Sequence, residues 1–307
     1  MSLIGVPGSV PHGDIYSPML YASKTLKVHL ETTVFNAIVN RTYESEFKKY
    51  GDKITIPYGF KPTAKTYTVD QKIDPENIRI ESTEFEIDKG LYISARVNDV
   101  QEKQSMLGLM DEWAKHGGWS LANAQDLQIL ADVHVDADAN NRGIAAGVES
   151  KSYNLGATNA PRAITAANII SVIQDAASVL DEQVVTGERF MVMPHLFVNM
   201  LQKALDSEGY FKDAGMVVKN GELPGTLGGF KIYKTNNVKP VLDPSGPQAY
   251  NILFGTKDAI TYAVQLDKTV DSVPSDNPFS KIRSQLMVYG YKVLIPVELG
   301  VLYAYKA

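Results

Sequence analysis

A single helical phase that persists from about residue 99 to residue 134 restricts the fold of this chain more than any other feature. Asp99 and Glu102 form an Asp-x-x-Glu capping box at its start. The residues that then share the phase are Met106, Met110, Trp113, Leu121, Ala124, Gln128 and Ala131. We therefore expect one helix of roughly 50 Å at 1.5 Å per residue, with Gly117-Gly118 as the place where it would kink. A helix of that length is unusual in a chain of 307 residues.

Extended segments precede this helix. Residues 1–16 hold three glycines and two prolines without an apolar period, which predicts an extended arm. Ser17-Pro18 then predicts the start of a helix, because it combines an N-cap residue with proline at the first helical position. One face of that helix would carry Leu26, Leu30 and Val34.

Between residues 50 and 97 the apolar period changes to two, which predicts strands. The alternating residues are Ile54, Ile56, Ile78, Ile80, Phe85, Ile87, Leu91, Ile93, Ala95 and Val97. Asp88-Lys89-Gly90 predicts a turn with positive φ at Gly90. The polar, proline-bearing residues 58–75 predict a long exposed β-excursion, which has too few apolar residues to form a core and must rest on another surface.

The second half of the chain predicts a compact α/β layer structure. Residues 136–163 are small, polar and glycine-bearing, and they form the best internal boundary. A helix capped at Thr165, a buried strand at 189–193 and a helix opened by Pro194 follow. The inward residues of these helices would be Ile169, Ile173, Ala176, Leu180, Phe197, Leu201 and Leu205. From residue 249 onward we expect strands, including 286–295 and 297–305, which Pro296 joins.

Composition excludes several classes of protein. A chain of 307 residues with 44% hydrophobic residues can bury a core in one or two domains. Its net charge of −5 shows no excess of positive charge of the kind that binds nucleic-acid phosphates. It has no cysteine, so disulfides, cysteine-ligated metals and thiol nucleophiles are excluded. We expect neither a membrane span nor a secretory signal, because no run of about 18 apolar residues exists and the N-terminus lacks a basic and an apolar region.

Residues 222–238, ELPGTLGGFKIYKTNNV, are glycine-rich and could in principle cradle a phosphate. A phosphate loop requires G-x-x-x-x-G-K-[ST] between a strand and a helix. Here Lys231 follows Gly228-Gly229 only after Phe230, and the glycines precede residues typical of a strand. We therefore favour a turn that leads into a strand over a phosphate site.

The polar clusters predict no catalytic, cofactor-binding or metal-binding residue. One acidic segment contains the alternating residues Asp132, His134, Asp136 and Asp138. On a strand these side chains would share one face and could hold a divalent cation. At the end of a helix they would point in different directions around the axis, and we favour this solvated helix end. The other four histidines lack an H-E-x-x-H pattern, and no G-x-S-x-G nucleophile motif occurs. For the tyrosines 289, 291, 303 and 305 we favour strand packing over stacking on single-stranded nucleic acid, because no basic groove surrounds them.

The order of elements resembles the major capsid proteins of tailed bacteriophages, which have the Hong Kong 97-like fold. The resemblance covers nearly the whole chain. Four segments carry it: 40–57 (NRTYESEFKKYGDKITIP), 221–238 (GELPGTLGGFKIYKTNNV), 254–260 (FGTKDAI) and 288–293 (VYGYKV). The sequences of these segments are most similar to those of the coat proteins of short-tailed phages of the Salmonella phage type. The inserted domain that some of those proteins carry is absent from the resemblance.

The resemblance implies an α+β fold in four parts. These are an N-terminal arm with the first helix (1–45), an extended β-loop (46–97), a peripheral domain with the long spine helix (98–149 plus 265–307) and an α/β axial domain (150–264). It also implies pentamers and hexamers that form an icosahedral shell around double-stranded DNA, without sequence-specific binding and without a membrane. The resemblance implies no catalytic residue. Lys61, Lys65 and Lys72 lie in the β-loop, but no crosslinking motif accompanies them, so we expect no crosslink.

The implied partners are a portal protein, a separate scaffolding protein and decoration proteins. The implied location is the virion capsid, with assembly in the cytoplasm of a bacterial host. Two alternatives stay open at this point. An encapsulin-like nanocompartment shares the fold and differs in cargo. An enzyme of two α/β regions would need a pocket with convergent polar groups, and the sequence offers no such set.

Overall fold

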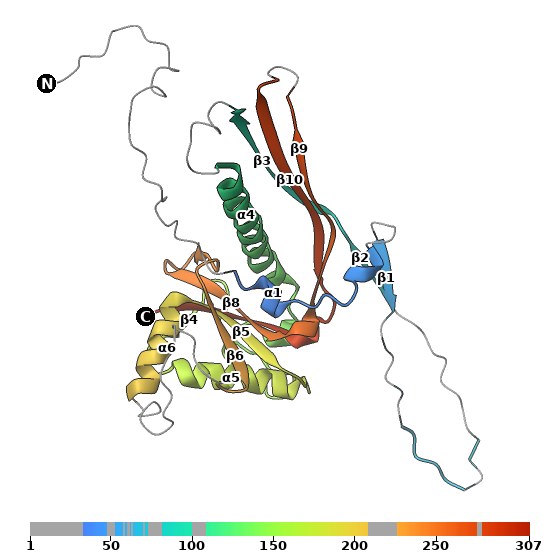
Figure 1. Cartoon of the computed structure of the whole chain (residues 1–307). Coiled ribbons are helices and arrows are strands. Elements are labelled where there is room, and N and C mark those ends of the chain that lie inside the picture. The colour runs from blue at the N-terminus through green and yellow to red at the C-terminus, as the bar shows by residue number, and fades with distance from the viewer. Residues whose placement is uncertain are drawn as a thin grey trace, which may run out of the picture.

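The computed structural model describes residues 33–47, 53–57, 59, 62, 64–69, 71–72, 82–99, 109–207, 226–274 and 278–307. Three parts are visible in Figure 1: a compact α/β body, a long arm in which a helix runs beside three strands, and a two-stranded ribbon that projects from the place where body and arm meet. The expected arm at 1–16, the helix start at Ser17-Pro18, Ile78, Ile80 and Glu102 lie outside the described residues.

The α/β body is built on a six-stranded mixed sheet with the order β4-β11-β8-β5-β6, in which β7 also pairs with β8. Its strands are β4 (Arg162–Ile164), β5 (Arg189–Pro194), β6 (Phe230–Thr235), β7 (Pro240–Leu242), β8 (Gln248–Thr256) and β11 (Leu299–Lys306). β5 pairs with β6 in parallel and with β8 in antiparallel orientation, and β11 pairs with β4 in parallel.

Both faces of this sheet are buried at β5, which explains why its residues after Arg189 are apolar. Met191 and Met193 point into a core with α5 (Ile169–Glu182) and α6 (His195–Ser207). Phe190 and Val192 point into a second core, which also contains the end of the long helix and the N-terminal segment. The predicted buried strand is thereby confirmed, and the body and the arm share a hydrophobic core across the sheet.

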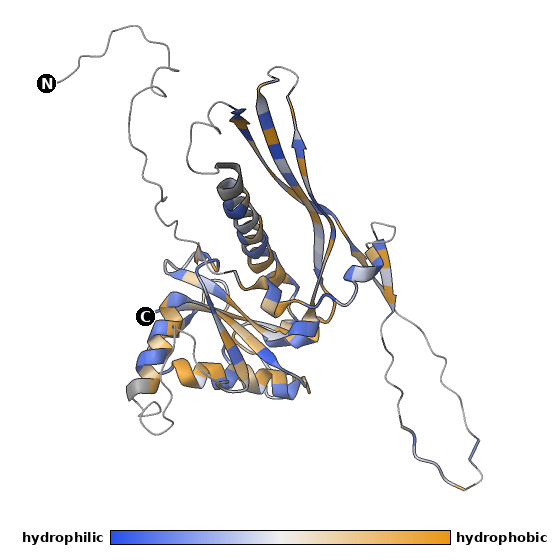
Figure 2. Cartoon of the chain, in the orientation of Figure 1, coloured by the Kyte–Doolittle hydropathy of each residue, from blue (hydrophilic) through white to orange (hydrophobic). Residues whose placement is uncertain are grey.

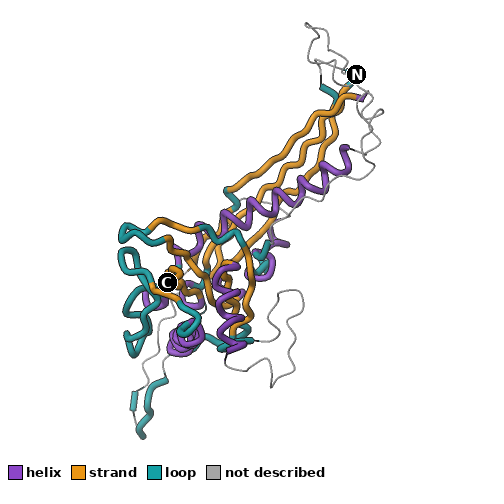
Figure 3. The backbone as a smooth tube through the Cα atoms, turned by 90° about the vertical axis from the view of Figure 1, so that its left-hand side faces the viewer, coloured by secondary structure: helices purple, strands orange, loops and turns teal. Residues whose placement is uncertain are grey.

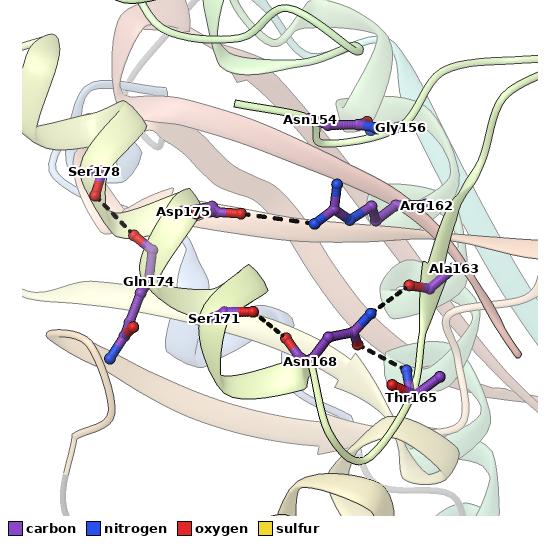
Figure 4. Close-up of polar contacts among 10 residues, drawn as sticks. All are labelled: Asn154, Gly156, Arg162, Ala163, Thr165, Asn168, Ser171, Gln174, Asp175 and Ser178. Atoms are coloured by element: carbon purple, nitrogen blue, oxygen red, sulfur yellow. Dashed lines mark hydrogen bonds and ion pairs between the residues drawn. The ribbon is translucent and has the colours of Figure 1, made fainter. Parts of the chain in front are cut away.

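Helices α5 and α6 confirm the predicted inward residues, since Ile169, Ile173, Ala176, Leu180, Phe197, Leu201 and Leu205 are all buried. The prediction of a cap at Thr165 is wrong. The residue before α5 is Asn168, whose side chain accepts a hydrogen bond from the Thr165 N–H (2.8 Å) and donates one to the Ala163 carbonyl (3.0 Å). Figure 4 shows this Asn168 side chain across the turn between β4 and α5. Asparagine thus closes the turn itself, as Asn side chains commonly do.

The arm consists of α4 (Leu109–Asp132) and a three-stranded antiparallel sheet with the order β3-β10-β9. We call this the long sheet; its strands are β3 (Lys89–Asn98), β9 (Ile260–Ser272) and β10 (Ser280–Val293). Figure 3 shows the three strands running along one side of α4. The helix continues through Gly117-Gly118 as predicted, and after Asp132 it becomes the 3-10 helix η2 (Val133–Asp136).

The predicted apolar face of this helix is partly wrong. Ala131 is exposed, and the buried positions are Gly117, Leu121, Gln125, Asp126, Ile129, Leu130 and, in η2, Val133. Two polar residues on the buried face concealed its true phase in the sequence. Figure 2 shows that the hydrophobic part of α4 lies at its C-terminal end, near the body.

Strand β3 confirms the alternation of 91–97, but the predicted turn at Gly90 is wrong. Gly90 lies inside β3, opposite Val288 of β10, and its φ is not positive. β2 (Ser82–Glu86) pairs with β1 (Lys53–Pro57) instead of β3, so the chain passes from one sheet to another without a hairpin. We call the β1–β2 pair the ribbon.

Two short helices, α1 (Phe35–Ile38) and α2 (Glu44–Phe47), connect the N-terminal segment to the body and the ribbon. Val34, predicted on a helix face, precedes α1 and is buried. Phe47 packs edge-on against Phe85 of β2, with 5.0 Å between ring centroids. These rings form a small separate core with Ile87 and Ala263, so the root of the ribbon has its own hydrophobic support.

The C-terminal strand differs from the predicted division of the chain. Residues 299–306 form β11 and pair with β4 and β8, whose residues belong to the predicted 150–264 region. The sequence analysis grouped 265–307 with the long helix. Of residues 265–307, only those of β9 and β10 lie beside α4, and the 3-10 helix η5 (Pro296–Glu298) marks the passage between the two sheets.

Candidate assembly surfaces

A buried carboxylate joins three separate parts of the chain. Asp126 of α4 is fully buried, and its Oδ1 accepts hydrogen bonds from the N–H groups of Val34 (3.0 Å) and Phe35 (2.7 Å). Its Oδ2 accepts one from the side-chain amide of Asn237, which follows β6, at 2.7 Å. We call these four residues the Asp126 junction. Because a buried carboxylate is costly unless hydrogen-bonded, this set of donors favours one arrangement of the N-terminal segment, helix and body.

A column of three tyrosines fastens the long sheet to α4. The rings of Tyr262 (β9), Tyr289 and Tyr291 (β10) follow one another with centroids 6.0 and 6.4 Å apart. Each hydroxyl donates to one α4 side chain, and the acceptors are Gln125, Gln128 and Asp132. These acceptors are three and four residues apart, so they lie on one helix face. Burial raises the pKa of each tyrosine, to about 12 for Tyr289, so all three hydroxyls stay protonated donors at neutral pH.

The long sheet has an outer face that no described element covers. Leu91 and Met287 pack in the core on the α4 side, whereas Tyr92 and its cross-strand neighbour Leu286 point the other way. Tyr92 is 76% exposed and Leu286 40% exposed, and Val270 in the next row is 44% exposed. We call the surface formed by Tyr92, Leu286 and Val270 the outer face. Exposed apolar residues grouped on one sheet face are typical of a protein interface.

Hydrogen bonds fix the N-terminal segment to β9 and the ribbon to β10. Asn40 extends the edge of β9: its N–H donates to the Ile260 carbonyl (2.8 Å), and its carbonyl accepts from the Tyr262 N–H (2.9 Å). Lys292 of β10 donates to the Glu84 carbonyl of β2 at 2.7 Å. Beyond these contacts the ribbon projects from the body (Figure 1). Described residues of the excursion, such as Tyr67 and Val69, are exposed, at 63% and 85%.

The acidic residues around His134 do not act as one cluster in the fold, because they have separate hydrogen-bond partners. Asp132 accepts the Tyr291 hydroxyl at 2.5 Å, and Asp138 accepts the Asn140 N–H at 2.8 Å as the cap of η3 (Ala139–Asn141). Burial lowers the pKa of His134. In the part of the chain that the structure describes, no group of three or more His, Cys, Asp or Glu side chains could hold a metal ion.

The glycine-rich segment is described from Thr226 and forms the predicted turn. Gly228 and Gly229 have φ values of 57° and 80°, and Leu227 and Phe230 pair across them. Phe230 then begins β6 and is buried, so the glycines lead into a strand as predicted. Leucine or lysine would be strained at these positive φ angles, which accounts for the glycines without a ligand.

The other residues noted in the sequence also have structural roles or lie on the surface. Tyr289 and Tyr303 are buried in strands, and the Tyr303 hydroxyl donates to Asp243 at 3.0 Å. Lys65 and Lys72 are exposed in the excursion, and Lys61 lies outside the described residues. Among the described helices, none is long and apolar enough to cross a membrane.

Comparisons with known proteins place this architecture. No family model matches the chain, and no curated protein matches it. Several solved structures do match the chain. The capsid of the cyanophage P-SCSP1u has a TM-score of 0.71 at 16% identity, with 96% of this chain and 94% of that chain covered. A chain from Mycobacterium phage Che8 has a TM-score of 0.69 at 24% identity, over 93% and 96%. The capsid of Ralstonia phage GP4 has a TM-score of 0.64 at 16% identity, over 99% and 98%.

These matches show the fold. The chain has the Hong Kong 97-like fold, a mixed α and β architecture that phage capsid chains share over nearly their full length.

The Asp126 junction and the tyrosine column were not predicted from the sequence. A polar residue on the apolar side of a helix was the available signal, because buried carboxylates and amides need specific partners.

Proposed function

We propose that this chain is the major capsid protein of a tailed bacteriophage and assembles as pentamers and hexamers into an icosahedral shell around double-stranded DNA. The observation that carries the proposal is the nearly complete mutual coverage with capsid chains, 99% and 98% for the Ralstonia phage GP4 capsid. The solved structures that share the fold over this length are phage capsids, whose subunits have a structural role. We therefore assign a structural role and no enzymatic one.

The surfaces support a subunit that works in contact with copies of itself. Most of the described residues of the ribbon and of the excursion are exposed in one chain, and the outer face exposes Tyr92 and Leu286. Neighbouring subunits would cover these surfaces, and heterologous contacts of one chain with the next close into rings. In this proposal 1–45 is the N-terminal arm, 46–97 the extended loop, 98–149 with most of 265–307 the peripheral domain, and 150–264 with β11 the axial domain.

The partners in this proposal are a portal protein, a separate scaffolding protein and decoration proteins. The DNA would be enclosed without sequence-specific contacts, since a chain with a net charge of −5 lacks the counterion-release contribution of a DNA-binding protein. The shell would belong to the virion and form in the cytoplasm of the bacterial host. A closest relation to Salmonella-type short-tailed phages and the absence of a lysine crosslink are further parts of the proposal.

Electron microscopy of the native particle that contains this chain tests the proposal. Closed shells with DNA and a tail at one vertex support it. Shells filled with an enzyme would instead identify an encapsulin, which the phage capsid neighbours do not favour. A stable monomer with a ligand in a cleft would contradict both readings and point to the enzyme alternative. Denaturing mass spectrometry of the same particles checks the absence of a crosslink: we expect only the mass of the single chain and no covalent multimer.

A further inference from the structure

A pocket of about 320 Å³ lies where the N-terminal segment, the base of the ribbon and the body meet. The N-terminal segment contributes Asn40 and Tyr43, and the ribbon contributes Ile56. Asp258 lies in the 3-10 helix η4 (Lys257–Ala259), Glu298 lies in η5, and Thr261 lies near the start of β9. We call this the ribbon-base pocket.

Two carboxylates line the ribbon-base pocket without a cationic partner. Asp258 accepts one hydrogen bond, from the Asn40 side-chain amide at 2.9 Å, and Glu298 accepts one, from the Thr256 hydroxyl. Among the described residues, neither carboxylate forms an ion pair, and no lysine or arginine lines the pocket. Asp258 Oδ2 and Glu298 Oε1 accept none of these hydrogen bonds and therefore keep acceptor capacity.

A buried hydroxyl adds an independent indication of a ligand. Thr261 lines the same pocket, is 1% exposed, and its Oγ1 has no hydrogen-bond partner among the described residues. Buried polar groups are nearly always paired, so an unpaired one at a pocket surface indicates a missing donor or acceptor. A group with several N–H donors would satisfy Thr261 together with the two carboxylates.

The walls of the pocket indicate the shape of that group. Ile56, Leu294 and Ile295 supply apolar surface around the polar atoms. The volume corresponds to about ten waters at roughly 30 Å³ each, which is more than a bare metal ion fills. An aliphatic stem that ends in an ammonium or guanidinium group matches both parts of the lining, because lysine and arginine place their stems on apolar surface and their charge on polar groups.

We propose that the ribbon-base pocket receives a lysine or arginine side chain from a second copy of this chain. The inference rests on the proposed function, in which copies of the chain adjoin at the ribbon. The cationic head bonds to Asp258, Glu298 and Thr261, and its stem packs on Ile295. The contact would join one subunit to the place where the N-terminal segment, ribbon and body of its neighbour meet. It would thus link the position of the ribbon to assembly.

A cryo-electron microscopy map of the assembled shell at side-chain resolution tests the inference. The expected result is density from a neighbouring subunit's lysine or arginine that reaches Asp258 and Glu298. Density from the same subunit, an isolated ion or solvent alone would overturn the inference, while the shell itself would leave the proposed function standing. Failure to find any shell would overturn both.

The double variant Asp258→Asn/Glu298→Gln provides a second test. Both changes remove charge but keep an oxygen that accepts the existing Asn40 and Thr256 hydrogen bonds. We expect the concentration needed for shell formation to rise about tenfold, with a weaker dependence on salt, because a charge-assisted contact is lost. The control Asp136→Asn/Glu188→Gln changes the same charge at exposed positions outside the pocket. Equal effects of the two pairs, or no effect of the first pair on a chain that folds normally, would overturn the inference.

Discussion

Asp126 Oδ1 on α4 accepts a hydrogen bond from the backbone N–H of Phe35 at 2.7 Å, across 91 residues of sequence. The same oxygen accepts the Val34 N–H, so one carboxylate oxygen closes the N-terminal end of α1. Phe35 packs against Tyr262, with 5.5 Å between ring centroids, and thereby connects the junction to the tyrosine column. The segment that enters the fold is thus held by the same helix that supports the long sheet.

Replacing Asp126 with alanine tests this connection. Asp126→Ala leaves buried N–H donors of Val34, Phe35 and Asn237 without an acceptor, and we expect a loss of about 3 kcal/mol in the free energy of unfolding. Asp126→Asn keeps one acceptor oxygen but faces Asn237 with an amide N–H, so its loss should be smaller. Denaturant unfolding of the unassembled chain measures both, and hydrogen exchange should show faster exchange at 33–39. Asp136→Ala, at an exposed site, is the control; an equal midpoint for Asp126→Ala and the parent would contradict the role of the junction.

The outer face gives a prediction about assembly rather than folding. Tyr92→Lys/Leu286→Lys places two charges on exposed positions of the long sheet. Because these positions face each other across β3 and β10, we expect the two lysines to repel and the unassembled chain to lose up to about 1 kcal/mol in the free energy of unfolding. Shell formation should fall strongly, because a charge buried at an interface without a partner is unfavourable. Light scattering under assembly conditions measures this. Val135→Lys, also exposed at 60% but outside the outer face, should assemble normally. Normal assembly of the double variant would exclude the outer face as an interface.

Gly290 sets the distance between β10 and the root of the ribbon. A Cβ at this position would lie 2.4 Å from the Glu86 carbonyl oxygen and 3.0 Å from Ile87 Cα, both backbone atoms that cannot rotate away. Gly290→Ala should therefore destabilise the chain by more than about 1 kcal/mol and shift the ribbon. In Gly118→Ala the new Cβ meets nothing within 4 Å, and the helix should gain about 1 kcal/mol. Thermal unfolding of both variants gives the comparison; equal stability of Gly290→Ala and the parent would show that the ribbon has room at this contact.

Asp243 gives the fold a pH dependence at the acidic end. Burial raises the pKa of Asp243, but hydrogen bonds from Ser245, Asn159 and Tyr303 outweigh it and lower the pKa from 3.8 to about 2. Because the pKa is lower in the folded chain, the contribution to stability is present above pH 3.8 and is lost as the pH falls toward 2. Asp243→Asn should be less stable at pH 7 and should show a flatter loss of stability between pH 5 and pH 2. Ser245→Ala, which removes one donor, should lie between the two; an unchanged acid profile in Asp243→Asn would contradict this assignment.

The sequence predicted most of the elements because their apolar periods reflect burial directly. β5 reads as a buried strand since both of its faces are covered, and α5 shows its inward face in Ile169, Ile173, Ala176 and Leu180. The long helix was found, but its buried phase was misjudged, because Gln125 and Asp126 occupy core positions. Only their distant partners Tyr262, Val34 and Phe35 make those polar residues fit there, and no local pattern reveals such partners.

Two other differences have a similar cause. Asp88-Lys89-Gly90 looks like a hairpin turn, yet β2 and β3 pair with strands far away in the sequence, which local residues do not specify. The position of β11 in the body rather than beside α4 also depends on pairing with β8 and β4. The ribbon-base pocket combines residues from three separate segments, so only the folded chain brings Asp258, Glu298 and Thr261 to one surface.

The central claim is that copies of this chain build a closed shell, and a cryo-electron microscopy reconstruction of the native particle tests it most directly. We expect icosahedral symmetry, with pentamers and hexamers whose subunit density follows the body, arm and ribbon described above. Subunit contacts should cover the outer face and the excursion. A particle whose shell density does not follow this chain, or a chain that is found only as a monomer, would contradict the account.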